Sequence, residues 1–361
     1  MHIEEISIRN FRNIENENIF PYKGINLIIG KNAQGKTNFL ESIYVVSNLK
    51  SFRGKKISET INNNFLNSIL KVKVNKNRVS NLIYLEIEKN LKNLLLNNKK
   101  PTKISESVGL LDTVLFYPDD IIVVKGSPVL RRSLLDRAIF QTDNNYLSLF
   151  QEYLRCLKQR NAALKGKEEI SDLWDNQFVE LATRVTFYRL NYVERINRIL
   201  DETFDNIYQC GEKVQIKYPA SEEDPQTFKK NFSARLAAGR KKELLYGLTL
   251  VGPHREDPQF LLNGQSLSLY GSQGQQRSFM LAFKTAQVID FKEQRGIRPV
   301  LLLDDMTSEL DDDRRDSFFE SLLDQAGQVF VTSTDVNLLK HRRFSDARFL
   351  KVENGKIAEY N

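Results

Sequence analysis

The alternation of apolar and polar residues predicts β-strands in the first third of the chain. Residues 3–8 alternate, and residues 25–29 form an almost continuous apolar run, as in a strand buried on both faces. Three further strands separated by short polar turns are typical of an antiparallel sheet, at residues 71–74, 82–87 and 91–96. Later in the chain, Asn263 and Gly264 stand between apolar runs and predict a β-hairpin.

The middle of the chain has a helical pattern. Between residues 128 and 208 apolar residues recur every three or four positions, which predicts amphipathic helices. The sequence has no internal repeat and no sustained heptad, which excludes a long coiled coil. We therefore expect a strand-rich lobe of residues 1–117 and 240–361, with a helical lobe of residues 118–239 inserted into it.

A glycine-containing segment follows the strand at residues 25–29 and precedes a stretch with helical spacing. It consists of Gly30, Lys31, Asn32, Ala33, Gln34, Gly35, Lys36 and Thr37, with Asn38 after it. This is the context of a phosphate-binding loop, in which backbone N–H groups face a phosphate, Lys36 reaches the outer phosphates and Thr37 holds Mg²⁺. The alternative is a strand-to-helix turn that matches by chance. We predict that residues 30–38 bind a nucleotide.

A second apolar run, residues 300–303, ends in the two carboxylates of Asp304 and Asp305. A phosphate-loop enzyme needs an acid opposite its loop, so we predict that Asp304 holds Mg²⁺ together with Thr37. Asp305 is then placed to polarise the attacking water, and Asp305 and Lys36 are the predicted catalytic residues. The chain has no Asn-Lys-x-Asp segment of the kind that reads guanine, so ATP is the expected nucleotide.

Arg12 and Asn13 lie in the turn after the first predicted strand. The second strand leads from this turn into the phosphate-binding loop, so we expect both residues near the nucleotide. A solvated turn that contacts no ligand explains them equally well from the sequence alone.

The formal net charge of +7 is consistent with a polyanionic partner, although the many Lys, Asn and Ile residues also fit a compositional bias. The two cysteines, Cys156 and Cys210, form no CxxC pair and are expected to be buried in a reducing environment. The acidic N-terminus does not resemble a signal peptide, and no apolar run approaches the ~20 residues that span a bilayer. We therefore expect a soluble, cytoplasmic protein.

Basic residues gather in two segments suited to a nucleic-acid backbone, the polar face of the antiparallel sheet and a predicted helix. The DNA-binding candidates are Lys71, Lys73, Lys76, Arg78, Arg155, Lys158 and Arg160. A solvated sheet face and an ordinary amphipathic helix explain the same residues without a ligand.

The segment around residue 272 introduces a family resemblance. Ser272, Gln273, Gly274 and Gln275 resemble the signature motif of ABC-type ATPases, and residues 304–311 resemble their Walker B strand and D-loop. The resemblance implies an α/β fold, the ABC-type P-loop ATPase head, with a mixed sheet and helices, an antiparallel β-subdomain and the inserted helical lobe. A signature motif binds nucleotide held by another subunit, so Ser272, Gly274 and Gln275 imply two composite sites in a head-to-tail homodimer that forms on ATP binding.

Segments along the whole chain also resemble the RecF family of bacterial recombination proteins, including residues 10–13, 51–53, 118–136, 159–161, 252–255 and 272–277. The resemblance implies an ATP-dependent DNA-binding protein of recombinational repair that acts at single-strand gaps. Its implied partners are duplex DNA and duplex/single-strand junctions, RecR, and downstream RecO and the RecA recombinase that it helps to load. Thr334 stands where many ABC-type ATPases carry a γ-phosphate histidine, which argues for slow hydrolysis and a timing role. The resemblance to the RecF family implies a weak ATPase that DNA stimulates.

Two other classes of protein share part of this pattern. The nucleotide-binding subunit of an ABC transporter shares the loop, the signature and the acids, but it leaves the basic strands unexplained. A P-loop kinase of small molecules has no use for a signature motif. ATP-driven dimerisation with tighter duplex binding separates the repair protein from both.

Overall fold

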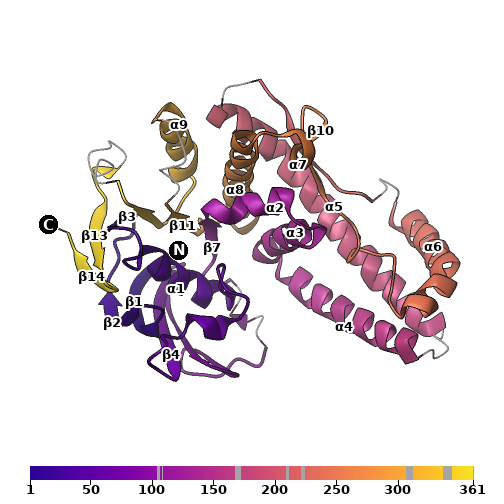
Figure 1. Ribbon diagram of the computed structural model, residues 1–361, viewed down its shortest axis with the longest axis horizontal. Coiled ribbons are helices and arrows are strands. Elements are labelled where there is room, and N and C mark those ends of the chain that lie inside the picture. Colours follow the sequence, from indigo (N-terminus) through magenta and orange to yellow (C-terminus); the bar gives the residue numbers. More distant parts are fainter. Residues whose placement is uncertain are drawn as a thin grey trace. The chain divides into compact units, whose positions relative to one another are not determined.

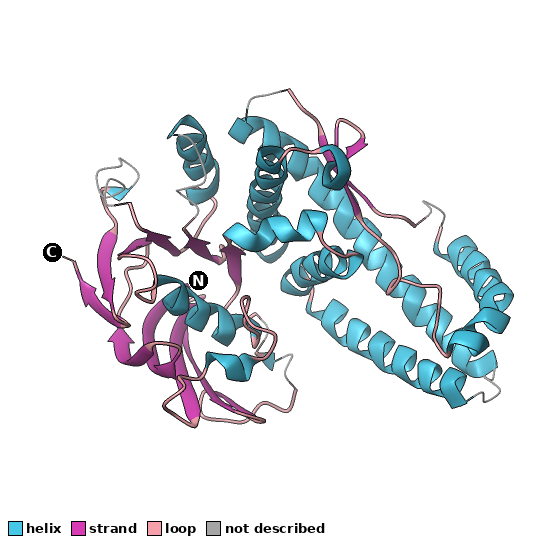
Figure 2. Cartoon of the chain, viewed as in Figure 1, coloured by secondary structure: helices cyan, strands magenta, loops and turns pink. Residues whose placement is uncertain are grey.

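The computed structural model describes residues 1–103, 106–107, 109–166, 172–208, 211–220, 224–305, 312–335 and 344–360. The chain divides into two compact units (Figure 1). Unit 1 consists of Met1–Asp120, Asn206–Gln209 and Leu281–Asn361, and unit 2 consists of Ile121–Asp205 and Cys210–Met280. Figure 2 shows that most strands belong to unit 1 and that unit 2 is mainly helical.

The central sheet of unit 1 has the strand order β14-β13-β3-β12-β11-β7. Its strands are β3 (Ile25–Ile29), β7 (Thr113–Phe116), β11 (Val300–Asp304), β12 (Val329–Ser333), β13 (Arg348–Glu353) and β14 (Lys356–Glu359). All neighbours pair in parallel except β13 and β14, so the sheet is mixed. Since β3 and β11 run in the same direction on either side of β12, their carboxyl ends lie at one edge of the sheet.

An antiparallel sheet, in the order β2-β1-β4-β5-β6, forms the second layer of unit 1. Its strands are β1 (His2–Phe11), β2 (Ile14–Ile19), β4 (Asn67–Lys76), β5 (Val79–Glu88) and β6 (Lys92–Leu96). The helix α1 (Lys36–Asn48) buries Phe39 and Ile43 in a core that also contains Val72 of this sheet and Leu302 of the central sheet. The start of α1 is therefore held by both layers.

The other face of the central sheet is also covered. Leu301 and Leu303 share a core with Leu281 of α8 (Gln273–Arg295) and Phe318 of α9 (Asp312–Leu323). Because both faces of β11 are buried, the strand is apolar at consecutive positions rather than alternating.

Unit 2 is built from helices and one small sheet, β10-β9-β8. Its elements are α2 (Ile122–Lys125), α3 (Pro128–Thr142), α4 (Asn144–Gly166), most of α5 (Asp172–Tyr208), β8 (Val214–Lys217), α6 (Pro225–Tyr246), β9 (Gln259–Leu262), β10 (Gln265–Ser266), α7 (Leu267–Tyr270) and the start of α8. The Asn263-Gly264 turn joins β9 and β10, as the sequence predicts. The described residues contain no long coiled coil, and none of their helices has the length and apolarity needed to cross a membrane.

The division into units differs from the predicted one after residue 239, because residues 240–280 pack with unit 2. The buried guanidinium of Arg160 on α4 supplies a reason. It donates hydrogen bonds to Glu243 on α6 (2.6 Å) and to the Thr249 hydroxyl (2.8 Å). Breaking a buried ion pair is costly, so these contacts hold this stretch against the helical lobe.

Candidate nucleotide-binding site

The loop after β3 and the end of β11 meet at the carboxyl edge of the central sheet. The Thr37 hydroxyl, at the second residue of α1, donates a hydrogen bond to Oδ1 of Asp304 over 2.9 Å. The same oxygen accepts a 2.8 Å hydrogen bond from the Thr332 hydroxyl on β12. Asp304 and Thr332 are partners in the β11–β12 register. The strand order β3-β12-β11 places the loop after β3 near the end of β11, so that Thr37 and Asp304, the two residues predicted to hold a metal ion, lie in contact.

Burial dominates the electrostatics of both acids. It raises the pKa of Asp304 above its ordinary value, against the hydrogen bonds from Thr332 and Thr37. It also raises the pKa of Asp305, whereas Lys36 lowers it. Hydroxyl and carboxylate oxygens are the ligands that Mg²⁺ prefers, and a cation would offset the unfavourable burial of these charges. The donor set therefore fits a magnesium ion.

The predicted phosphate-binding loop surrounds the side chain of Lys36. Lys36 is 6% exposed, and its Nζ donates hydrogen bonds to the carbonyl oxygens of Gly30 (2.8 Å) and Lys31 (3.1 Å). Burial lowers the pKa of Lys36, while Asp305 raises it. Ala33 and Gly35 have left-handed backbone angles, with φ of 62° and 119°. Left-handed residues in such a loop turn backbone N–H groups toward a shared concavity, which is the geometry of an anion site.

The structure places Arg12 and Asn13 beside this loop, in contact with protein groups. Arg12 forms a bidentate ion pair with the fully buried carboxylate of Glu41 on α1, at 2.8 and 2.9 Å. Asn13 donates from Nδ2 to the carbonyl oxygen of Gln34 (3.0 Å) and accepts at Oδ1 from Nδ2 of Asn38 (2.8 Å). Asn13 therefore supports the loop directly, whereas Arg12 is bound to the helix that follows it.

The signature residues form the N-terminus of α8. The Ser272 side chain accepts the N–H of Gln275 (3.2 Å), and the Gln275 side chain accepts the N–H of Ser272 (2.9 Å). This reciprocal pair is a capping box, which stabilises a helix start. Ser272 and Gly274 are exposed, and both belong to unit 2. The predicted nucleotide-binding residues thus fall in two different units, and the D-loop segment 306–311 lies outside the described residues.

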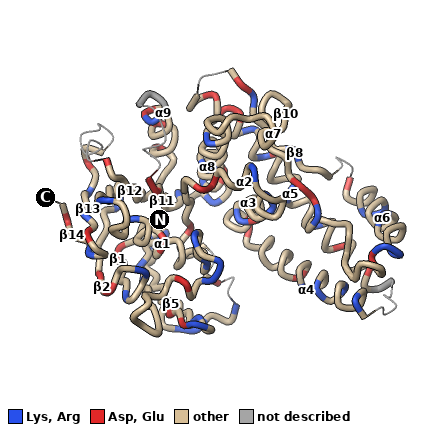
Figure 3. Tube along the Cα trace, viewed as in Figure 1, with Lys and Arg blue, Asp and Glu red and all other residues tan. Residues whose placement is uncertain are grey.

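The DNA-binding candidates differ in accessibility. Lys71 and Lys73 project from the solvent face of β4, because their neighbours Val72 and Val74 point into the core. Lys76 is partly buried and forms an ion pair with Asp112. The other three exposed candidates are Arg78, Arg155 and Lys158. Figure 3 shows basic segments beside β5 and along α4 and α6.

The prediction that Arg160 contacts DNA is wrong. Arg160 is 1% exposed and is held by Asp175 (3.0 Å) as well as by Glu243. The helical spacing contained this information. Arg160 follows the buried residues Tyr153 and Cys156 of α4 by seven and four positions, which places it on the inner face of the helix.

Sequence reasoning missed Thr332 and Glu41. Thr332 connects the two acids, because its hydroxyl donates to Asp304 and accepts the N–H of Asp305 (3.0 Å). Thr334, which stands at the position of the γ-phosphate histidine of other ABC-type ATPases, is exposed beyond the end of β12. A buried acid on an apolar helix face, such as Glu41, was a signal that a basic partner was needed.

The segment 252–255 has a packing role. Nδ1 of His254 lies 2.6 Å from the Tyr153 hydroxyl, and Nε2 lies 3.1 Å from the Thr249 carbonyl oxygen. Burial lowers the pKa of His254 to about 4, so the ring is neutral near neutral pH. Tyr153 then donates to Nδ1, and the protonated Nε2 donates to Thr249. These bonds fix the segment on α4.

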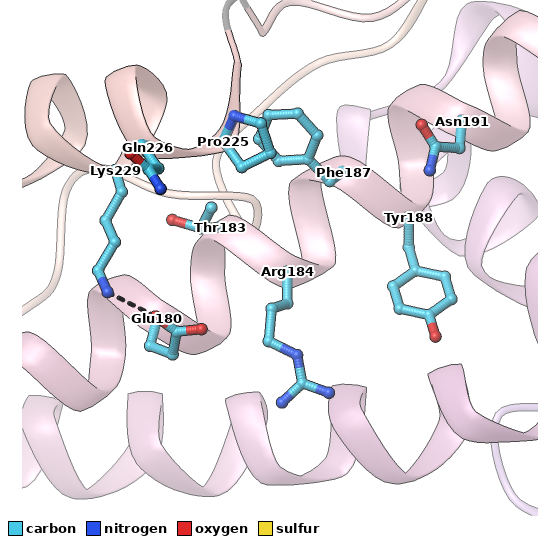
Figure 4. Close-up of a pocket in the computed structure, with 9 residues that line it drawn as sticks. All are labelled: Glu180, Thr183, Arg184, Phe187, Tyr188, Asn191, Pro225, Gln226 and Lys229. Atoms are coloured by element: carbon cyan, nitrogen blue, oxygen red, sulfur yellow. Dashed lines mark hydrogen bonds and ion pairs between the residues drawn. The ribbon is translucent and has the colours of Figure 1, made fainter.

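A pocket of about 490 Å³ lies between α5 and the start of α6 in unit 2 (Figure 4). Its lining residues are Glu180, Thr183, Arg184, Phe187, Tyr188, Asn191, Pro225, Gln226 and Lys229. Lys229 is engaged by Glu180 at 2.6 Å. None of these residues belongs to the predicted nucleotide or DNA sites, and we assign the pocket no ligand.

Comparison with known proteins identifies the family. The family model for the RecF/RecN/SMC N terminal domain matches residues 2–356. The chain is 38% identical over 362 residues to the DNA replication and repair protein RecF of Syntrophotalea carbinolica, covering 100% of both chains. It is also 38% identical to RecF of Geotalea uraniireducens, covering 99% of this chain and 100% of that protein.

Solved structures agree with this relationship. A structure of the recombination mediator protein RecF-ATP in the RecFOR pathway is 31% identical, with a TM-score of 0.91, and covers 100% of this chain and 98% of the other. An SMC head structure, 17% identical, covers 100% of this chain and 98% of the other with a TM-score of 0.58, and supports the fold alone. The chain therefore belongs to the RecF family of the RecF/RecN/SMC N-terminal domain proteins and has their ABC-type ATPase fold.

Proposed function

We propose that the chain is an ATP-dependent DNA-binding protein of recombinational repair. The observation that carries the proposal is the contact between Thr37 and Asp304, which joins the phosphate-binding loop to the acidic end of β11. An acid beside the loop hydroxyl is the arrangement that phosphate-loop enzymes use for a nucleotide with its metal ion. The related structure named RecF-ATP supports ATP as the nucleotide.

Each residue of the loop has a defined role in this proposal. Lys36 leaves the carbonyl oxygens of Gly30 and Lys31 and bonds to the β- and γ-phosphates, which offer stronger charge-assisted contacts. The backbone N–H groups of residues 31–37 face the phosphates. Thr37 and Asp304 would hold Mg²⁺, which would neutralise part of the phosphate charge.

Hydrolysis is assigned to Asp305. Burial raises the pKa of Asp305 toward neutral pH. Its carboxylate therefore accepts a proton from the attacking water more readily than that of an ordinary aspartate. Thr334 supplies no imidazole for the γ-phosphate, so transition-state stabilisation is incomplete. We expect slow hydrolysis, stimulated by DNA, that times the release of a bound state.

The exposed start of α8 completes a second subunit's site. Ser272, Gly274 and Gln275 offer a hydroxyl and helix N-terminal amides to a γ-phosphate. Two such sites, each with the loop of one subunit and the signature of the other, require a head-to-tail homodimer. ATP then joins the subunits and hydrolysis separates them.

DNA binding is assigned to Lys71, Lys73, Arg78, Arg155 and Lys158, which are exposed. Such contacts read the phosphate backbone and carry little sequence information. The related structure is described as part of the RecFOR pathway, which supports RecO and RecR as partners. Action at single-strand gaps and assistance in loading RecA belong to the proposal through the family resemblance.

Titration of a fluorescent duplex with and without Mg²⁺-ATP tests the proposal. ATP should tighten duplex binding at least about tenfold, since one ATP-bound dimer presents two sets of basic residues. Equal affinity with and without ATP, under conditions where calorimetry shows saturation by ATP, would refute the ATP-dependent part.

A further inference from the structure

The turn between β13 and β14 contacts the phosphate-binding loop. The N–H of Gly355 donates to the carbonyl oxygen of Gln34 over 2.9 Å, and the N–H of Asn354 donates to its Oε1 over 2.7 Å. Gln34 and Asn354 are 320 positions apart in the sequence. The β13–β14 hairpin therefore forms hydrogen bonds with both the backbone and the side chain of Gln34.

Asn13 closes this contact from the other side. Its Nδ2 donates to the same Gln34 carbonyl oxygen over 3.0 Å. Gly355 packs directly on the Asn13 backbone, since a Cβ at position 355 would lie 2.0 Å from the Asn13 carbonyl oxygen. Only glycine fits there without displacing the turn or Asn13.

Gln34 lies between the two left-handed residues of the loop, Ala33 and Gly35. A left-handed conformation is disfavoured for a residue with a Cβ, so Ala33 needs outside contacts to stay in it. The bonds to Gln34 supply such contacts at the next residue. They restrain the loop in the conformation that directs its N–H groups at a phosphate.

We propose that the β13–β14 turn is a positioning element of the nucleotide site, acting through Gln34 and Asn13. The turn holds the loop in its binding conformation before the nucleotide arrives, so that ordering the loop costs little on binding. By linkage, ATP in turn stabilises the hairpin. This inference rests on the proposed binding of ATP at residues 30–38.

The chain offers a matched control for the test. Asn263-Gly264 is a second Asn-Gly hairpin turn, with φ of 49° and 77° against 48° and 80° in Asn354-Gly355. A Cβ on Gly264 meets nothing within 4 Å. Gly264→Ala and Gly355→Ala thus impose the same backbone strain, but only the second disturbs the loop.

Calorimetric titration with Mg²⁺-ATP should show a Kd at least about tenfold weaker for Gly355→Ala and a change of less than about twofold for Gly264→Ala. Gln34→Ala adds no bulk and removes one acceptor, so it should weaken ATP about threefold to tenfold while leaving the unfolding temperature without nucleotide nearly unchanged. If Gly355→Ala fails to fold, the ATP affinity of Gln34→Ala tests the inference instead. Parental affinity in Gln34→Ala would overturn the inference.

Hydrogen exchange supplies a readout that a purely structural contact would not change. ATP should slow exchange of the Asn354 and Gly355 amides in the parent protein and leave the Gly264 amide unaffected. Unchanged exchange at residues 354 and 355 in the ATP-saturated parent would overturn the inference while ATP binding itself stands. A parent that binds no ATP would instead refute the proposed function, and this inference with it.

Discussion

Thr37 and Asp304, which are 267 positions apart in the sequence, are joined by a 2.9 Å hydrogen bond from the hydroxyl to the carboxylate. One residue begins α1, and the other ends β11. Both lie at the carboxyl edge of a sheet whose order places β12 between β3 and β11. The fold itself therefore brings together the two residues proposed to bind the metal ion.

Lys36→Ala is expected to abolish ATP binding, because the loop loses the charge that offsets the β- and γ-phosphates. Isothermal titration calorimetry with Mg²⁺-ATP measures this directly. Lys50→Ala removes the same charge from an exposed position and is the control. Parental affinity in Lys36→Ala would remove the assignment of the phosphate-binding loop.

Asp305→Asn should retain ATP binding and slow hydrolysis by about 10²-fold or more, because the amide cannot accept a proton from water. Phosphate release at saturating ATP measures the rate. The variant should also accumulate in the ATP-bound state. If it hydrolyses ATP as fast as the parent, the catalytic base is a different residue.

Asp304→Asn is expected to raise the thermal stability of the ligand-free protein at pH 7. Burial raises the pKa of Asp304 in the folded state, so the charged carboxylate opposes folding at pH values above that pKa. Asparagine removes this cost and keeps an oxygen that accepts from Thr37 and Thr332.

The sign of the pH dependence follows from the same shift. As the pH falls through the raised pKa toward the ordinary value of 3.8, Asp304 of the folded parent takes up a proton. The buried charge is then lost, and the parent is no longer less stable than Asp304→Asn. The difference in unfolding temperature should therefore shrink on acidification. A difference that is constant from pH 7 to pH 4 would show that the charge of Asp304 is not its cause.

The local parts of this site could be predicted from the sequence, and the long-range parts could not. Periodicity and composition identified the strand before Gly30, the loop and the acids that end β11, because each is a property of a few neighbouring residues. The Thr332 contact depends on the β11–β12 register, and the Gln34 contact depends on a turn 320 positions away. Neither pairing leaves a mark in local sequence.

The helical lobe shows the same limit. A basic segment in α4 indicated DNA contacts, but spacing assigns Arg155 and Lys158 to the exposed face and Arg160 to the buried one. Local charge does not reveal that Glu243, 83 positions later, neutralises Arg160. The same ion pair holds Glu243 in the helical unit, which therefore extends beyond residue 239, the predicted end of the helical lobe.

Duplex affinity should fall steeply with salt, and reversal of the exposed strand cations should flatten the slope. Each lost phosphate contact lowers the magnitude of the slope of log K against log salt by about 0.9. The test set is Lys71→Glu, Lys73→Glu and Arg78→Glu, and the control set, of equal charge change at exposed positions, is Lys213→Glu, Lys217→Glu and Lys23→Glu. Equal slopes for the two sets would place the DNA on another surface.

The proposed composite site predicts that a large, charged side chain at position 272 prevents dimerisation. Ser272→Arg should leave ATP binding by the monomer nearly intact, because the loop of the same chain is untouched, but it should block dimerisation by bulk and charge at the γ-phosphate. The substitution also removes a helix cap, at a cost of about 1 kcal/mol. Ser272→Ala loses the same cap and the hydroxyl offered to the γ-phosphate but adds no bulk or charge, so it separates loss of the contact from a steric block.

The molar mass in solution with saturating Mg²⁺-ATP, measured by light scattering, tests the ATP-driven dimer most directly. The parent should double in mass when ATP is added. Ser272→Ala should do so only at a higher protein concentration, because it loses the hydroxyl contact, and Ser272→Arg should remain a monomer although calorimetry shows that it binds ATP. A parent that stays monomeric when saturated with ATP, or a Ser272→Arg variant that doubles in mass like the parent, would contradict the composite site.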